Sequence, residues 1–379
     1  MKYSQLYTPG HKEDVEHAGL ENFEKYMRRA IELAEMGRGT TNPNPMVGAV
    51  ILKGDRVVGE GYHKRAGEPH AEIYALRNAS EDVAGATMIV SLEPCNHFGR
   101  TPPCTEAIIN AGIKKVVIGM IDPNSKCTGD GIKRLIDAGI EVDYGLLADE
   151  VARQNEVFIK YITTGRPFIT VKAAISLDGK IAEAPETSTP ITGEEAKKRV
   201  HELRNEYDAI MVGIGTVLAD DPLLTTRLER DDVKNPTRIV VDSRARLPLS
   251  SRVSSTTRDV RTIVAATSLA SPSNIDGLRA KGMEVLKLGS RNGSVDINLL
   301  LEELGRLEVS SVIVEGGGNL IASFVRANLV DKYLIFIAPK LIGERGVDFI
   351  GGKLKSIEEV RIERVERVGE DLLIEAYPR

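Results

Sequence analysis

The stretches PHAE, residues 69–72, and LEPCNHFGRTPPC, residues 92–104, decide how the first half of this chain folds and what it can bind. They bring one histidine, His70, and two cysteines, Cys95 and Cys104, into a short part of the sequence. Histidine nitrogen and cysteine sulfur are preferred zinc ligands, and a catalytic zinc site keeps three protein ligands and leaves a fourth position for water. The set therefore predicts a catalytic zinc site, with Glu72 beside it as the group that moves protons.

Hydrolytic removal of an amino group from a pyrimidine ring needs water that ionises near neutral pH, and bound zinc lowers the pKa of water from about 15.7 to about 7. A His-x-Glu pair followed by Pro-Cys is the pattern of zinc nucleobase deaminases, in which the glutamate is not a ligand but a general acid and base. The second half departs from that pattern, because eight residues separate Cys95 from Cys104. His97 lies inside this loop and is a rival ligand.

Two other interpretations of the cluster are a structural zinc site and a pair of ordinary thiols near a core histidine. Structural sites usually have four protein ligands, with cysteines in closely spaced pairs. The chain has only three cysteines, and Glu72 follows the histidine closely, so catalysis is favoured. Cys127 lies outside the motif and is predicted to be an ordinary buried or half-buried thiol.

Length and composition limit the classes of protein to consider. A chain of 379 residues predicts two domains. The sequence is 42% hydrophobic and 28% charged, with no stretch of apolar residues long enough for a membrane span and no secretory signal. The net charge of −5 argues against a nucleic-acid partner. Few cysteines, two of them assigned to a metal, favour a cytoplasmic protein.

The pattern of helices and strands predicts α/β folds in both halves. Residues 1–21 are expected to be a poorly ordered extension, residues 22–165 an α/β three-layer domain, and residues 166–379 a second α/β domain. The boundary is placed at the turn-forming stretch TGRP, residues 164–167. A single helix is expected over residues 148–164. In the second domain, strands that alternate with helices imply a largely parallel sheet, and two runs flanking residues 368–371 predict an antiparallel hairpin at one edge.

The second half also has two glycine-rich turns at strand–helix junctions, residues 213–216 and 316–318. Such turns expose backbone N–H groups to phosphate, but neither has the spacing of a dinucleotide-binding fingerprint. Nucleotide binding and ordinary tight turns both remain open on this pattern. Arg204 and Arg227 are candidates for a substrate phosphate, although a single arginine is more often a solvated surface residue.

Seven motifs, taken together and in order, resemble the bifunctional deaminase–reductase family of riboflavin biosynthesis. They are TNPNPMVGAVI, GYHKRAGEPHAE, SLEPCNHFGRTPPC, AAISLDGKIA, GTVLADDPLLTTR, VEGGG and IAPKLIG. The resemblance covers residues 22–379. It implies a cytidine-deaminase-like domain that holds Zn²⁺ and a dihydrofolate-reductase-like domain that uses NADPH. The implied substrate is a pyrimidine ribose phosphate, which is deaminated and then reduced from ribosyl to ribityl.

The resemblance also assigns roles to individual positions. In the deaminase these are the ligands His70, Cys95 and Cys104, the proton shuttle Glu72, and the substrate contacts Asn44, His63, Arg100, Asp122 and Asn124. In the reductase the implied cofactor contacts are Ala174, Thr192, Thr216, Asp220, Ser243 and Gly316, Gly317 and Gly318. The implied substrate contacts of the reductase are Ser188, Arg204, Leu224, Arg227 and Glu315.

Two positions depart from the family pattern. Pro190 stands where close relatives often have tryptophan, and Arg100 stands where some have lysine. The first departure keeps open an alternative, a zinc deaminase of a nucleobase or tRNA with a degenerate reductase half. Arg244 and Arg246 are compatible with the 2′-phosphate of NADPH. We also expect a homo-oligomer, since the closing hairpin could pair between subunits.

Overall fold

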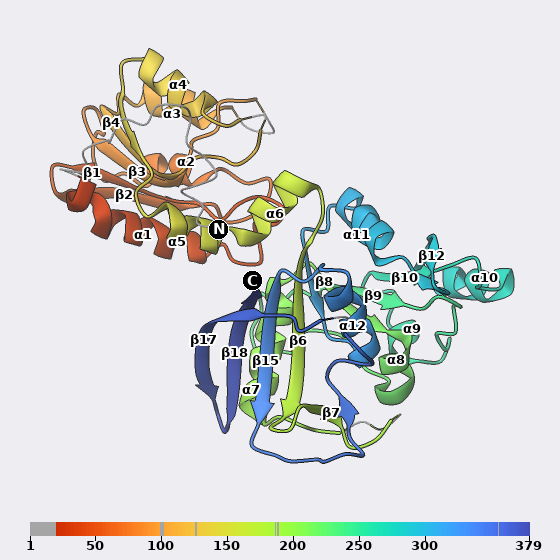
Figure 1. The fold of residues 1–379 in the computed structure, drawn as a ribbon. Helices are drawn as coiled ribbons and strands as arrows, with labels where there is room; N and C mark the ends of the chain where they lie inside the picture. The colour runs from red at the N-terminus through yellow and green to blue at the C-terminus, as the bar shows by residue number, and fades with distance from the viewer. Residues whose placement is uncertain (1–19, 99–101, 126, 186, 188, 355) are drawn as a thin grey trace. The chain divides into compact units, whose positions relative to one another are not determined.

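The computed structural model describes residues 20–98, 102–125, 127–185, 187, 189–354 and 356–379 (Figure 1). The chain divides into two compact units, Met1–Gly165 and Arg166–Arg379. The expected N-terminal extension lies almost entirely outside the described residues, as do Arg100 and Ser188. None of the helices in the described ranges has the length and apolar character needed to cross a bilayer.

The first unit contains one five-stranded sheet in the order β2-β1-β3-β4-β5. Its elements are η2 (Leu20–Phe23), α1 (Glu24–Glu35), β1 (Gly48–Lys53), β2 (Arg56–Tyr62), α2 (Ala71–Arg77), β3 (Thr87–Leu92), α3 (Cys104–Asn110), β4 (Lys115–Met120), α4 (Asp130–Asp137), β5 (Glu141–Tyr144), α5 (Ala148–Gln154) and α6 (Glu156–Thr164). Strands β1 and β2 form an antiparallel hairpin, and β3, β4 and β5 run parallel.

Helices cover both faces of this sheet and give it three layers (Figure 1). Helix α1 buries Met27, Ala30 and Leu33 against one face. On the other face, α2, α3 and α4 pack their apolar side chains against β1, β3 and β4. Strands buried on both faces read as continuous apolar runs, which is why TMIVSL and VVIGM are visible in the sequence.

The helix expected over residues 148–164 is two helices, α5 and α6, separated at Asn155. Asn155 is buried, with φ −102° and ψ 20°. Its side chain accepts a hydrogen bond from the Met46 backbone N–H (2.8 Å) and donates one to the Met46 carbonyl (3.0 Å). The break therefore fixes the loop that precedes β1. Periodicity could not reveal it, because the partner lies far away in the sequence.

The second unit is built on a nine-stranded sheet in the order β11-β10-β9-β8-β14-β6-β15-β18-β17. Its elements are β6 (Phe168–Ser176), β7 (Lys180–Ala182), α7 (Glu194–Glu206), β8 (Ala209–Gly213), α8 (Ile214–Asp220), β9 (Thr237–Val241), α9 (Arg252–Ser255), β10 (Thr262–Ala266), α10 (Pro272–Ala280), β11 (Glu284–Lys287), β12 (Ser290–Arg291), β13 (Ser294–Val295), α11 (Ile297–Arg306), β14 (Ser311–Val314), α12 (Gly318–Arg326), β15 (Lys332–Ala338), β16 (Val347–Asp348), β17 (Val360–Val368) and β18 (Asp371–Pro378).

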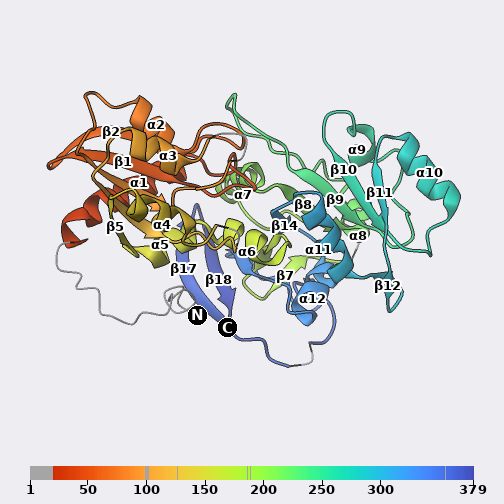
Figure 2. The same ribbon diagram turned by 90° about the horizontal axis from the view of Figure 1, so that it is seen from above.

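In this sheet, strands β11, β10, β9, β8, β14, β6 and β15 run parallel to one another. Strands β18 and β17 extend one edge in antiparallel pairing. Figure 2 shows this closing hairpin as the dark blue strands at the C-terminal end of the chain. The predicted parallel sheet with an edge hairpin is therefore confirmed.

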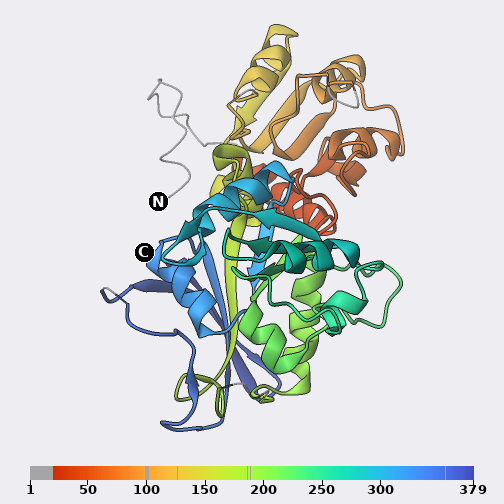
Figure 3. The ribbon, with the colours of Figure 1, turned by 90° about the vertical axis from the view of Figure 1, so that its right-hand side faces the viewer.

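Two helical layers enclose the large sheet. Helices α7, α8 and α10 pack on one face, where they share a core with Ile210, Val240 and Phe336. Helices α11 and α12 pack on the other face against Ile169 and Val312. Figure 3 shows the green helix α7 and the blue helix α12 on opposite sides of the sheet. Because β8, β9, β14 and β6 are parallel, the loops at their carboxyl ends gather along one edge, where α/β proteins bind ligands.

Candidate active sites

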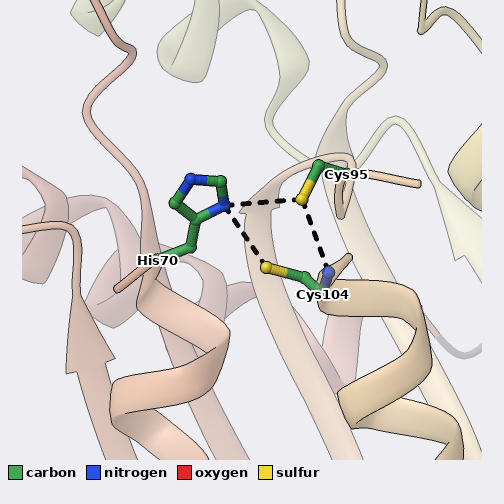
Figure 4. Close-up of side chains that lie close together, drawn as sticks. All are labelled: His70, Cys95 and Cys104. Carbon is green, nitrogen blue, oxygen red and sulfur yellow. Dashed lines mark hydrogen bonds between the residues drawn. The ribbon is translucent and has the colours of Figure 1, made fainter. Parts of the chain in front are cut away.

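The predicted zinc ligands form a cluster in the first unit (Figure 4). His70 Nδ1 lies 3.5 Å from Cys95 Sγ and 3.3 Å from Cys104 Sγ. All three ligand atoms lie within 4.8 Å of one another, and this is the only group of metal-binding type among the described residues. His97 does not join it, because its Nδ1 lies 3.4 Å from Cys127 Sγ instead.

Three local structures aim these side chains at one point. His70 is the N-cap of α2 and has an extended backbone (φ −75°, ψ 168°), so it is not on the regular helix that carries Glu72. This resolves why two residues only two positions apart can serve one site. Cys95 follows the end of β3, and Cys104 is the first residue of α3. The Cys104 backbone N–H donates to Cys95 Sγ at 3.4 Å.

The pKa values of the cluster are shifted by contacts among its own three side chains. Hydrogen bonds from Cys104 and His70 lower the pKa of Cys95 to about 4, and the Cys95 sulfur raises the pKa of His70 to about 9. The same bond to Cys95, with burial, raises the pKa of Cys104. One thiol is therefore ionised and the other retains its proton. A bound divalent metal would release the remaining protons, because the ligands of zinc are thiolate and neutral imidazole. The donor set fits zinc.

Glu72 lies beside the cluster and is only 3% exposed. Burial raises the pKa of its carboxyl group. Its Oε2 is buried and has no hydrogen-bond partner among the described residues. Burying an unpaired carboxylate is costly, so this atom is suited to a ligand or water within the site.

Asn44 and His63 form the next contacts around His70. The ring of His63 packs edge-on against the ring of His70, with centroids 5.3 Å apart. His63 Nδ1 lies 3.1 Å from the Pro69 carbonyl, which can only accept, so Nδ1 carries the proton. Its Nε2 then accepts from Asn44 Nδ2 at 3.3 Å. Burial lowers the pKa of His63, which keeps the ring neutral.

Asp122 and Asn124 lie in the connection between β4 and α4. Asp122 Oδ1 accepts from the Asn124 backbone N–H at 2.8 Å, and burial raises the pKa of Asp122 to about 6. This connection is held by Glu93, a residue to which the sequence analysis assigned no role. Glu93 is 5% exposed and accepts four backbone hydrogen bonds.

The second unit contains a cleft of about 1310 Å³ at the carboxyl ends of its parallel strands. Most of the residues expected in the reductase site line it: Ala174, Arg204, Thr216, Asp220, Leu224, Ser243, Glu315, Gly316, Gly317 and Gly318. Thr192 and Arg227 are not among the lining residues. The cleft is also lined by Lys172, Arg244, Arg246 and Arg291.

Glu315 is a buried carboxylate of the cleft that pairs with two cationic side chains. Its oxygens accept from Arg204 Nε (2.9 Å) and Nη2 (2.8 Å), and from Lys172 Nζ (3.2 Å). Burial opposes ionisation of Glu315, but the charges of Arg204 and Lys172 prevail and lower its pKa to about 2. Arg204 is thus committed to Glu315 rather than pointing freely into the cleft. The sequence did not single out Lys172, although it directly precedes the AAISLDGKIA motif.

The turn at Gly316–Gly318 begins α12 and fits a phosphate group. The Gly317 N–H donates to Thr216 Oγ1 at 3.1 Å, which joins the two glycine-rich turns seen in the sequence. A Cβ on Gly318 would lie 2.6 Å from the Asp348 carbonyl oxygen, so only glycine fits there. A helix N-terminus with exposed N–H groups favours an anion, and a nicotinamide cofactor supplies a pyrophosphate. The residues of the cleft therefore fit NADPH.

Comparisons with known proteins agree with this geometry. Residues 20–120 match the model of the cytidine and deoxycytidylate deaminase zinc-binding region, and residues 167–374 match that of the RibD C-terminal domain. RibD of Aquifex aeolicus is 45% identical over 352 residues, covering 92% of this chain and 96% of the relative. RibD of Actinobacillus pleuropneumoniae is 44% identical over 355 residues, covering 92% and 94%.

Solved structures give the same result. The chain superposes on Acinetobacter baumannii RibD with a TM-score of 0.86 at 36% identity, covering 95% of this chain and 99% of that one. A deaminase/reductase from Thermotoga maritima gives a TM-score of 0.83 at 38% identity, also covering 95% and 99%.

Fold and site thus define a zinc-dependent deaminase joined to an NADPH-dependent reductase. The chain belongs to the RibD family, the bifunctional deaminase–reductases of riboflavin biosynthesis. The alternative of a nucleobase or tRNA deaminase with a degenerate second half is not favoured, because the relatives match both halves.

Proposed function

We propose that the first unit deaminates 2,5-diamino-6-ribosylamino-4(3H)-pyrimidinone 5′-phosphate, and that the second unit reduces the ribosyl chain of the product to ribityl. The observation that carries the proposal is the convergence of His70, Cys95 and Cys104 within 4.8 Å, beside the buried Glu72, whose Oε2 has no hydrogen-bond partner in the described part of the chain. The Thermotoga maritima relative bears the names of both activities.

In the deaminase, His70, Cys95 and Cys104 would hold zinc. When bound, zinc lowers the pKa of water so that hydroxide is available to attack the ring near neutral pH. Glu72 Oε2 would take a proton from the attacking water and pass it to the ring nitrogen. It would then take the proton of the hydroxyl group added to the ring carbon and pass it to the departing amine. Burial raises the pKa of Glu72, and a carboxyl group with a pKa closer to neutral can both accept and return a proton.

Around this centre, Asn44, His63, Asp122 and Asn124 would hold the pyrimidine. Neutral His63 orients the Asn44 amide through its Nε2, and so decides which atoms of Asn44 face the ring. Asp122 is acceptor-rich and suits ring N–H or amino groups. Arg100 is assigned to the phosphate by resemblance alone, because it lies outside the described residues.

In the reductase, NADPH supplies the hydride, so the protein needs only to bind and orient the two molecules. The Gly316–Gly318 turn and Thr216 would hold the cofactor, together with Ala174, Asp220 and Ser243. Thr192 is assigned to the cofactor by resemblance alone, because it does not line the cleft. Glu315, kept ionised by Arg204 and Lys172, would accept hydrogen bonds from ribose hydroxyls. Leu224 lines the cleft and would contact the substrate. Ser188 and Arg227 are assigned to the substrate by resemblance alone, with Arg227 as a candidate for its phosphate.

Both activities can be followed in one cuvette, with zinc-loaded protein and the diaminopyrimidinone phosphate. We expect ammonia release followed by NADPH oxidation, with NADH a poorer donor. Ammonia release without NADPH oxidation would contradict the reductase assignment and direct attention to Pro190. The absence of both signals would contradict the substrate assignment.

Three further features belong to the proposal. The partners are small molecules and not nucleic acid, consistent with the net charge of −5. The enzyme is a homo-oligomer, since β17 leaves an edge strand that can pair. It works in the cytoplasm, where three free cysteines, two of them zinc ligands, stay reduced.

A further inference from the structure

The buried carboxylate of Glu93 lies immediately after β3, two residues before the ligand Cys95. Its Oε2 accepts from the backbone N–H groups of Asp122 and Gly129, both at 3.1 Å. Its Oε1 accepts from those of Gly131 (2.9 Å) and Ile132 (3.3 Å). Glu93 forms no ion pair among the described residues, and these four partners are all backbone N–H groups.

Helix capping does not account for all of this arrangement. Gly131 and Ile132 lie in the first turn of α4, where a carboxylate is commonly found as a partner of free N–H groups. The Asp122 N–H, however, lies at the other end of the connection between β4 and α4. One side chain therefore holds both ends of the segment from Asp122 to Gly131.

The segment also packs closely against the residues between the end of β3 and Cys95. A Cβ on Gly131 would lie 2.1 Å from the Pro94 carbonyl oxygen, so no other residue fits without moving the backbone. Within the segment, Asp122 Oδ1 accepts from the Asn124 N–H, and the Thr128 hydroxyl donates to the Asp122 carbonyl at 3.0 Å. The Asp122 and Asn124 side chains are therefore held relative to the ligand strand through Glu93.

We propose that Glu93 is a positioning residue of the deaminase, which sets the distance between the pyrimidine contacts Asp122 and Asn124 and the metal centre. This inference rests on the proposed roles of Asp122 and Asn124. Glu93 acts on the affinity for the pyrimidine and not on proton transfer, which belongs to Glu72.

Glu93→Gln tests the proposal in the full-length, zinc-loaded enzyme. Glutamine has one acceptor oxygen, and its NH₂ group would face N–H donors, so about half of the hydrogen bonds to the segment would be lost. We expect the KM for deamination to rise about tenfold or more, because hydrogen bonds to a charged group are among the stronger ones. The kcat, zinc content and NADPH-dependent reduction should stay near the values of the unmodified enzyme.

Glu106→Gln is the matched control. The half-buried side chain of Glu106 pairs with Arg134, which lies on α4. The same substitution there removes a contact of the same helix and leaves the segment intact. Its KM should not change. Asp122→Ala, alone and combined with Glu93→Gln, tests whether Glu93 acts through Asp122. If it does, the KM of the double variant should be close to the KM of Asp122→Ala.

The outcomes distinguish a failure of the proposed substrate contact at Asp122 from a failure of the positioning role of Glu93. An unchanged KM for Asp122→Ala would contradict the proposed substrate contact. A raised KM for Asp122→Ala with an unchanged KM for Glu93→Gln would overturn the positioning role, as would a loss of zinc or a fall in kcat alone. If Glu93→Gln does not fold, Glu93→Asp replaces it, since the shorter carboxylate keeps the charge but cannot reach all four donors, and the same KM criterion applies.

Discussion

At the scale of single residues, the proposed deamination depends on the carboxylate of Glu72, which is not one of the proposed metal ligands. Glu72→Gln keeps the shape of the side chain but removes its ability to take a proton. We expect ammonia release to fall by about a hundredfold or more, the range for loss of a general acid–base group. Zinc content, measured by metal analysis, should be unchanged.

The reductase half of the same chain is the internal control for Glu72→Gln. NADPH oxidation with substrate that has already been deaminated should proceed at the original rate. A large loss of zinc in this variant would instead show that Glu72 supports the metal directly.

Glu315 has the opposite electrostatic character, because its pKa is lowered to about 2 from the ordinary value of 4.5. A lowered carboxylate pKa contributes stability that is complete above the ordinary value and is lost as the pH falls toward 2. Unfolding of the reductase half, followed by denaturant titration, should therefore become easier as the pH drops below about 4.5.

Glu315→Gln should remove much of that acid sensitivity and lower the stability at neutral pH. Removing one partner of a buried ion pair leaves Arg204 and Lys172 with uncompensated charge, at a cost of about 3 kcal/mol or more. Equal acid sensitivity in the variant and the unmodified enzyme would contradict the assigned pairing.

Residue types in motifs could be predicted, whereas roles that depend on the backbone could not. His70, Cys95 and Cys104 could be predicted as candidate zinc ligands because few types of side chain bind zinc. Glu93 stands within the same motif but was not assigned a role, because its partners are backbone N–H groups about thirty to forty positions later in the chain. Lys172 was missed since a single lysine in a strand carries no pattern.

At the scale of elements, the start of α12 depends on the absence of a side chain. A methyl group at Gly318 would lie 2.6 Å from the Asp348 carbonyl oxygen and 2.8 Å from the Gly351 nitrogen. Gly318→Ala should therefore displace the turn and raise the KM for NADPH about tenfold, the effect of roughly 1.4 kcal/mol. Steady-state kinetics at varied NADPH measure this.

Gly277→Ala is the control for this prediction. Gly277 lies within α10, and an added Cβ would meet only the flexible Leu249 side chain, at 3.3 Å. Alanine favours helix over glycine by roughly 0.5–1 kcal/mol, so this variant should keep its affinity for NADPH and its stability. An equal rise of KM in both variants would count against a specific role for α12.

Elements with a strong apolar pattern are recognisable in the sequence, and weakly patterned ones are not. The strands TMIVSL and VVIGM stand out as apolar runs because both of their faces are buried. Strand β5 (EVDY) was not expected, since it lies at the sheet edge and none of its residues is buried. Its pairing with β4 comes from backbone hydrogen bonds, which sequence does not report.

At the scale of the whole molecule, the two activities belong to separate compact units with separate cores. Removing zinc with a chelator should abolish ammonia release while NADPH oxidation of already deaminated substrate continues. Adding zinc should restore the first activity. The metal should also protect the first unit against unfolding, by about 2.7 kcal/mol when free zinc exceeds its dissociation constant a hundredfold.

A parallel loss of both activities on chelation would contradict this independence. Thermal unfolding with and without chelator is the companion measurement, and only the transition of the deaminase unit should shift.

The place of β6 in its sheet has a consequence for how the protein is made. The first unit uses only the first 165 residues, so it can fold while the ribosome is still adding the rest. Strand β6 opens the second unit, yet its neighbours β14 and β15 lie close to the end of the chain. We expect the apolar stretch of β6 to remain unpaired during most of the synthesis of the second unit. Because exposed apolar strands aggregate, we expect the reductase to need chaperones more than the deaminase does.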